Sequence, residues 1–208
     1  MLVVGLTGSI GMGKSTAAAR LRTHGIGVLD ADAVVHDLYE GPAVPLIAAA
    51  FPGATREGVI DRLRLAAILA ADPDGFRRLE AIVHPMVRAV ERSFLAAEAA
   101  RGAAMAVLEI PLLYETGGDA LVDVVVVVSA TAETQRRRVL DRPGMTEARL
   151  AQLLARQMAD TEKRRRADFV VDTNGTIAET EAQVDAIVAA LKGRTSTAYH
   201  RHWSPKVD

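Results

Sequence analysis

Short apolar runs separated by longer segments with helical spacing make up most of this chain. The runs are rich in Val, Leu and Ile, as is typical of strands buried on both faces, and they cover residues 2–6, 27–29, 105–110, 122–128 and 169–171. Strands that alternate with helices predict a parallel sheet covered by helices on both faces. We therefore expect an α/β fold with a three-layer, five-stranded parallel sheet and a functional site at the carboxyl ends of the strands.

The loop after the first of these strands carries the strongest chemical signal. Residues 8–15 read G-S-I-G-M-G-K-S, which fits the phosphate-binding P-loop pattern between a strand and a helix. Backbone N–H groups and the dipole at a helix N-terminus favour an anion, and glycines let the backbone wrap closely around it. Lys14 is expected to reach the β- and γ-phosphates, and the Ser15 hydroxyl to help hold Mg²⁺. The motif predicts a nucleoside triphosphate and leaves the second substrate open; a chance Gly-rich turn is the alternative.

Two long intervals interrupt the alternation of strands and helices. The first, residues 31–102, is mostly helical, with turn signals between Ala-rich helices expected at 64–71, 75–83 and 86–101. His84-Pro85 is expected to break or start a helix there. This interval fits a small helical domain inserted into the sheet domain.

The second interval, residues 130–167, reads as two helices around residues 142–146. Between positions 136 and 166 it holds ten Lys or Arg against four Asp or Glu. A solvated helical face is the plain interpretation of this excess, but a P-loop already implies phosphates, so we favour a lid that closes over them. The expected organisation is a nucleotide-binding core, the helical domain, the lid and a weakly ordered tail, at residues 1–30 with 103–129 and 168–195, 31–102, 130–167 and 196–208.

Carboxylates follow two of the expected strands. Asp30 and Asp32 come directly after the 27–29 strand, and Glu109 ends an apolar strand. At the carboxyl edge of a P-loop sheet such side chains face the phosphates. Asp32 is a candidate to orient an attacking hydroxyl and take its proton late in phosphoryl transfer, while Asp30 or Glu109 could reach Mg²⁺ through water. For Asp30, an N-cap of the following helix is an equal alternative.

The overall composition narrows the class of protein. Basic and acidic residues nearly cancel, 25 against 26, which argues against nucleic-acid or membrane-surface binding driven by charge. Cysteine is absent, which excludes disulfides and cysteine metal sites and suits a reducing cytoplasm. The N-terminus lacks a signal-peptide pattern, and no apolar run approaches the roughly 18 residues of a membrane-spanning helix. We expect a cytoplasmic protein with neither nucleic-acid nor membrane partners.

Several sequence blocks, taken in order, resemble one family. Residues 6–16 are close to its L-T-G-G-I-G-S-G-K-S-T, with Ser9 and Met12 departing from it, and residues 28–32 are similar to its V-[IL]-D-A-D. The other blocks are Asp61-Arg62 with Leu65, 79–85, 110–115, 133–135 with Arg138 and Arg142, Gln157, and 167–172 before Asn174-Gly175. The P-loop is generic, but the D-A-D, H-P and P-L-L-x-E blocks in this order are far more specific. The family is dephospho-CoA kinase, and the blocks span residues 2 to about 176.

The resemblance implies ATP-dependent phosphorylation of the ribose 3′-hydroxyl of dephospho-CoA, the final step of coenzyme A biosynthesis, with Mg²⁺ as cofactor and a nucleoside-monophosphate-kinase-like core. Asp32 would be the base, and Lys14, Arg138 and Arg142 the catalytic cations. The nucleotide site would comprise Gly8, Gly11, Met12, Gly13, Lys14, Ser15, Thr16, Asn174 and Gly175. The dephospho-CoA site would comprise Asp32, Arg62, His84, Pro85 and Glu115. A monomer is expected, with an oligomer left open.

Two other functions stay in view. Another P-loop kinase, acting on a nucleoside or nucleotide, would share the fold and the lid and differ only in the acceptor. A nucleotide-dependent switch would need a guanine-reading N-K-x-D motif, and none follows the P-loop. Asp141 to Gly144 matches the switch pattern D-x-x-G, but within a basic helical segment this is a chance match.

Overall fold

The computed structural model describes residues 1–204, and the chain folds as two units. The core unit consists of residues 1–29 and those from 95 onward, and the second unit of residues 30–94. This division runs close to the predicted helical domain, while the finer domain limits stay predictions. Among the described residues, no helix combines the length and the apolar character needed to cross a membrane.

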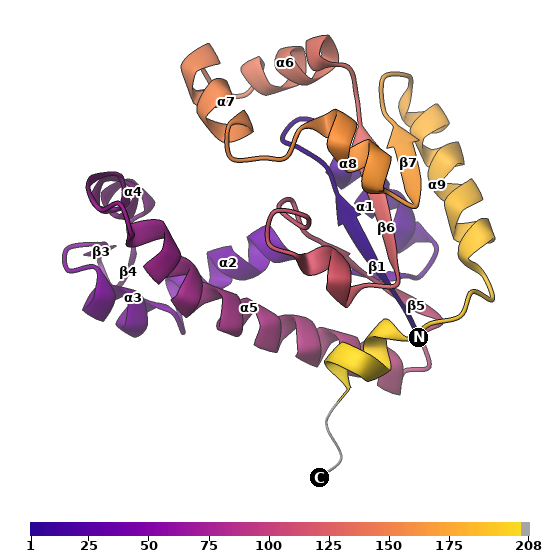
Figure 1. Ribbon diagram of the computed structural model, residues 1–208, viewed down its shortest axis with the longest axis horizontal. Coiled ribbons are helices and arrows are strands. Elements are labelled where there is room, and N and C mark those ends of the chain that lie inside the picture. The colour runs from indigo at the N-terminus through magenta and orange to yellow at the C-terminus, as the bar shows by residue number, and fades with distance from the viewer. Residues whose placement is uncertain (205–208) are drawn as a thin grey trace. The chain divides into compact units, whose positions relative to one another are not determined.

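A five-stranded parallel sheet forms the centre of the core unit (Figure 1). Its strands lie in the order β2 (Gly27–Asp30), β5 (Met105–Glu109), β1 (Leu2–Thr7), β6 (Val124–Ser129) and β7 (Phe169–Asp172). β1 pairs in parallel with both β5 and β6, and β6 with β7. The predicted fold class is confirmed, and every predicted strand is found within two residues of its expected ends. The carboxyl end of the central strand β1 leads directly into the P-loop.

Alternation along β6 explains how both faces of the sheet are buried. Val124, Val126 and Val128 point to the face covered by α1 (Lys14–Thr23) and α9 (Ile177–Leu191), where they join the main core cluster. Val125 and Val127 point to the opposite face and pack against Leu113 and Tyr114. A strand with apolar residues at both parities must be covered on both sides, so the all-valine run specifies a central strand.

The second unit is mostly helical, as expected, but it contains a hairpin that the sequence analysis missed. Its elements are α2 (Ala31–Glu40), α3 (Val44–Ala50), β3 (Thr55–Arg56), β4 (Val59–Ile60), α4 (Arg62–Ala71) and the first part of α5 (Gly75–Ala100). β3 and β4 pair antiparallel around Glu57 and Gly58, which both have positive φ angles of 52° and 82°. Two successive positive φ angles are typical of a two-residue hairpin turn.

The predicted break at His84-Pro85 is wrong. Helix α5 is continuous from Gly75 to Ala100 and contains Pro85 in its interior. A proline there removes one backbone hydrogen bond, but Leu79, Val83 and Leu95 of the same helix are buried, and this burial offsets the cost.

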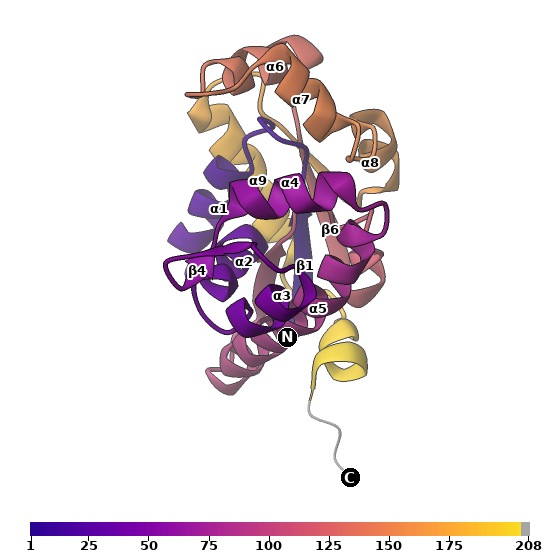
Figure 2. The same cartoon turned by 90° about the vertical axis from the view of Figure 1, so that its left-hand side faces the viewer.

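The predicted lid segment, residues 130–167, holds three helices instead of two. They are α6 (Ala132–Leu140), α7 (Glu147–Leu154) and α8 (Asp160–Arg166). α6 and α7 lie beyond the carboxyl ends of β1 and β6, whereas α8 runs alongside β6 (Figures 1 and 2). The unexpected helix α8 has acidic residues in its first turn and four basic residues in its last. That distribution stabilises a helix through its dipole, so part of the basic excess in this segment is explained by helix formation.

The predicted weakly ordered tail is wrong for residues 196–204. A π-helical turn at Tyr199–Trp203 places the indole of Trp203 in the interior, where Nε1 donates to the Leu121 carbonyl at 2.7 Å. Asp123 Oδ1 accepts the backbone N–H groups of Thr197 and Ala198. Burial of one large aromatic ring anchors this segment to the core unit. The rest of the predicted tail, 205–208, lies outside the described residues.

Candidate active site

The P-loop adopts a phosphate-cradling conformation that depends on its glycines. Gly13 caps α1 with a φ of 88°, a left-handed conformation that favours glycine. At Gly8 a Cβ atom would lie 2.4 Å from the Val128 carbonyl oxygen, so only glycine lets β1 and β6 approach here. Lys14 Nζ donates to the Gly8 carbonyl at 3.0 Å, so the lysine arches back across the loop. The ammonium group is thereby held over the backbone N–H groups that would bind a phosphate.

Met12, one of the two departures from the resembled P-loop pattern, has a structural role. Its side chain is buried, and its Sδ accepts the Ala130 N–H at 3.1 Å. Its carbonyl accepts the Thr173 hydroxyl at 2.9 Å. Met12 therefore ties the middle of the P-loop to the segments that follow β6 and β7.

Arg138 is brought to the P-loop, whereas Arg142 is not. Arg138 donates from Nη1 to Thr173 Oγ1 at 2.9 Å and from Nη2 to the Thr173 carbonyl at 2.6 Å. Because Thr173 also contacts Met12, one side chain separates this guanidinium from the P-loop backbone. Arg142 lies exposed in the connection between α6 and α7.

Two glutamines of the predicted lid segment hold the tip of the P-loop, a contact that sequence reasoning missed. Gln135 Nε2 donates to the Ile10 carbonyl at 2.8 Å, and Gln157 Oε1 accepts the Ile10 N–H at 3.2 Å. The peptide groups on both sides of Ile10 are therefore held by side chains. The two residues belong to the blocks that carried the family resemblance, which was the available signal, but nothing in the sequence indicated what they touch.

The loop after β7 is built around Asn174. Asn174 Oδ1 accepts the Thr131 N–H at 2.8 Å, and its Nδ2 donates to Asp172 Oδ1 at 2.7 Å. Gly175 lies against the Glu179 carboxylate, which caps the start of α9 with Thr176. These contacts fix the loop beside the beginning of α6 and thus near the P-loop.

Oxygen donors suited to Mg²⁺ lie at the same edge of the sheet. Ser15 is exposed in the first turn of α1. Glu109 is buried at the end of β5, where its Cα pairs with that of Leu6, two residues before the P-loop. Hydroxyl and carboxylate oxygens are the ligands that this ion prefers, so the residues fit a magnesium site. Asp30 instead caps α2, since its Oδ1 accepts the N–H groups of Asp32 and Ala33.

Comparison with known proteins agrees with this geometry. A family model described as dephospho-CoA kinase matches residues 2–179. A dephospho-CoA kinase of Rhizobium etli is 55% identical over 202 residues, which cover 97% of this chain and 100% of the relative. The chain belongs to the dephospho-CoA kinase family. It is accordingly an enzyme that phosphorylates dephospho-CoA with ATP, the last step of coenzyme A synthesis.

Solved structures support the fold of this dephospho-CoA kinase family member. A crystal structure of the protein TT1252 from Thermus thermophilus is 37% identical, has a TM-score of 0.80, and aligns over 92% of this chain and 98% of its own. A dephospho-CoA kinase from Campylobacter jejuni is 24% identical with a TM-score of 0.68, over 91% of this chain and 96% of its own, and supports the fold alone.

The remaining residues of the predicted dephospho-CoA site fall into different units. In the second unit, Arg62 Nη2 lies 2.9 Å from His36 Nδ1 and the guanidinium lies over the Tyr39 ring at 5.7 Å. His84 and Pro85 are exposed on α5. Asp32, also in the second unit, is exposed in the first turn of α2. Glu115 lies in the core unit.

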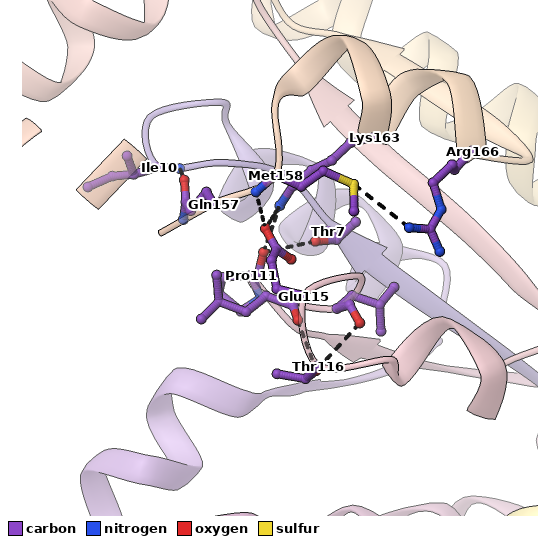
Figure 3. Close-up of polar contacts among 12 residues, drawn as sticks. Thr7, Ile10, Pro111, Glu115, Thr116, Gln157, Met158, Lys163 and Arg166 are labelled. Carbon is purple, nitrogen blue, oxygen red and sulfur yellow. Dashed lines mark hydrogen bonds and ion pairs between the residues drawn. The ribbon is translucent and has the colours of Figure 1, made fainter. Parts of the chain in front are cut away.

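Glu115 makes contacts that its predicted role does not require. Its Oε1 lies 2.9 Å from Lys163 Nζ and accepts the Met158 N–H at 2.7 Å. Lys163 is fully buried and was not among the predicted site residues. Figure 3 shows this cluster between the loop after β5 and the segment that leads into α8.

Proposed function

We propose that ATP binds along the P-loop and that its γ-phosphoryl group passes to the 3′-hydroxyl of dephospho-CoA, oriented by Asp32. The observation that carries this proposal is the placement of Lys14 Nζ over the P-loop at the N-terminus of α1. Family membership supplies the acceptor. In phosphoryl transfer the protein mainly positions the groups and balances charge, and this is what these side chains can do.

Ser15 and Glu109 would hold Mg²⁺, directly or through water. When bound, the ion would neutralise charge on the phosphates. The residues themselves act by position: α1 places the Ser15 hydroxyl beside the phosphate cradle, and β5 delivers the Glu109 carboxylate to the same edge of the sheet. We propose no metal role for Asp30, because capping of α2 accounts for its carboxylate.

Arg138 and Arg142 would supply positive charge to the transferred group from different starting positions. Arg138 already lies beside the P-loop through Thr173, whereas Arg142 is exposed and would arrive when residues 130–167 close. Closure also excludes water, which a kinase needs in order to avoid hydrolysing ATP. Arg62, His84 and Pro85 of the second unit are proposed to face dephospho-CoA. We further propose a cytoplasmic monomer.

Two substitutions test the proposed roles in a coupled assay of ADP release. Asp32→Asn should lower kcat by about 10²-fold or more while the affinity for ATP stays nearly unchanged, because it removes a group used at the acceptor. Lys14→Ala should weaken ATP binding and transfer together. Asp37→Asn is the matched control, since Asp37 is exposed on the same helix α2 and belongs to no proposed site. A near-normal kcat for Asp32→Asn would remove Asp32 from the reaction.

The acceptor is tested with the same assay and a panel of alcohols. Dephospho-CoA should support turnover, whereas adenosine and its phosphates should not. Strong turnover with an adenosine phosphate and none with dephospho-CoA would assign the chain to another class of small-molecule kinase. Limited proteolysis within 130–167 should slow when both substrates are present, and unchanged cleavage would contradict lid closure.

A further inference from the structure

The first half of the P-loop is held at both ends by one partly buried polar cluster. At one end, Thr7 Oγ1 donates to the Pro111 carbonyl at 3.1 Å. At the other, Ile10 N–H donates to Gln157 Oε1 at 3.2 Å. Pro111 and Gln157 belong to segments far apart in the sequence. These two anchors can position the P-loop only if the segments that carry them are themselves fixed relative to each other.

The ion pair between Glu115 and Lys163 makes that connection (Figure 3). Lys163 Nζ donates to the Pro111 carbonyl at 3.1 Å and lies 2.9 Å from Glu115 Oε1. The same Oε1 accepts the N–H of Met158, the residue directly after Gln157. The two contacts fasten the loop after β5 to the segment before α8, and they do so within one residue of each P-loop anchor.

The cluster lies in an environment where charge is costly. The Lys163 side chain is 0% exposed and that of Glu115 is 17% exposed. Burial raises the pKa of the neighbouring Tyr114 to about 12, although the Arg166 guanidinium over its ring opposes the shift. A buried ion pair replaced by apolar residues often costs nothing, so stability alone is a weak reason for charge here. Fixing the relative position of two segments is a better one.

We propose that Glu115 and Lys163 are positioning residues for ATP: their ion pair holds Gln157 and Pro111 in place, and these in turn hold the P-loop open for phosphate. The proposal rests on the nucleotide site proposed above. It assigns Glu115 to the nucleotide side of the reaction, in contrast to the dephospho-CoA contact that the family resemblance implies. Gln157 is the residue through which the pair acts on Ile10.

The test measures ATP binding without any acceptor. Isothermal titration of MgATP should show dissociation constants raised by about tenfold in Glu115→Gln and in Gln157→Leu, the scale expected when one hydrogen bond is lost. The KM for dephospho-CoA should stay within about twofold in both variants. Glu162→Gln is the matched control, because Glu162 forms an exposed pair with Arg165 on the same helix α8 and should bind ATP normally.

Two further readouts separate positioning from general destabilisation. Hydrogen exchange at the Ile10 amide should accelerate by about tenfold in both variants, since its acceptor is displaced or lost. The double variant Glu115→Gln/Gln157→Leu should bind ATP no more weakly than the single variant with the lower ATP affinity. The reason is that both changes act on the same hydrogen bond, from the Ile10 N–H to Gln157.

Opposite results would overturn the proposal. A raised KM for dephospho-CoA with unchanged ATP affinity in Glu115→Gln would return Glu115 to the acceptor site. Additive effects in the double variant, or unchanged exchange at Ile10, would show that the pair does not act through Gln157. Because titration needs no acceptor, an error in the proposed acceptor would leave this test intact, whereas a wild-type protein that does not bind ATP would refute the proposed function itself.

Discussion

Replacing Thr173 by valine should destabilise the core unit through one hydroxyl group. Thr173 is buried, and its Oγ1 donates to the Met12 carbonyl and accepts from Arg138 Nη1, both at 2.9 Å. The hydroxyl also lies 3.3 Å from the Ser129 carbonyl. Valine has nearly the same shape, so the change removes all three contacts without leaving a cavity. The hydroxyl joins three parts of the core unit: the P-loop, the end of β7 that leads into Thr173, and the helix α6 that carries Arg138.

The loss of stability in Thr173→Val depends on whether the Met12 carbonyl and the Arg138 guanidinium find other hydrogen-bond partners. Met12 is buried, so its carbonyl loses its hydrogen-bond donor and stays unsatisfied, which costs about 1–3 kcal/mol of stability. Arg138 is half-buried and keeps its second bond to the Thr173 carbonyl, so its Nη1 can turn to water at a cost of about 0–1 kcal/mol. We expect Thr173→Val to lower the free energy of unfolding by about 2–3 kcal/mol. Thr173→Ser keeps the hydroxyl, loses one methyl group and should cost about 1 kcal/mol.

Urea unfolding followed by tryptophan fluorescence measures this difference. Trp203 is the only tryptophan and is buried in the core unit, so its emission reports unfolding of that unit. A loss of 2 kcal/mol should shift the midpoint by about 1 M. Equal midpoints for the valine and serine variants would show that the hydroxyl bonds contribute nothing and would refute the account of Arg138 held beside the P-loop.

Two further predictions concern the contacts that close the core unit. Trp203→Phe keeps an aromatic ring in place but leaves the Leu121 carbonyl without its donor. It should lower the free energy of unfolding by about 2 kcal/mol, measured by thermal unfolding followed by circular dichroism. An unchanged melting temperature would contradict the anchoring role of this segment. Hydrogen bonds from Arg20 and His24 hold the pKa of the Asp185 carboxyl well below its usual value. The stability from this cluster, which links α1 and α9, is therefore present above about pH 4 and lost as the pH falls through the lowered pKa, and Asp185→Asn should flatten that acid dependence in pH-dependent melts.

The predictable parts of the structure are those determined by local pattern. The valine run of β6 and the glycines of the P-loop each fix a conformation through neighbours in the sequence, and the strands and the loop were predicted correctly. The hairpin at 55–60 was missed because its strands are two residues long and their turn, Glu57-Gly58, differs from the commoner Asn-Gly and Asp-Gly signals. Trp203 was assigned to a weakly ordered tail because a single aromatic residue has no periodicity from which burial could be inferred.

The candidate site divides in the same way. Lys14 and Ser15 follow from the motif alone, because one loop supplies them. Gln135, Gln157 and Thr173 contact Ile10 and Met12 across 125 to 161 positions of sequence, and no local spacing encodes such contacts. Gln135 and Gln157 come from residues 130–167, the predicted lid segment, and Thr173, which Arg138 binds, directly follows β7. If residues 130–167 move as the lid proposed above, these hydrogen bonds would couple that movement to the conformation of the P-loop. Such coupling is reciprocal, so ATP bound to an ordered loop should also favour one arrangement of the proposed lid.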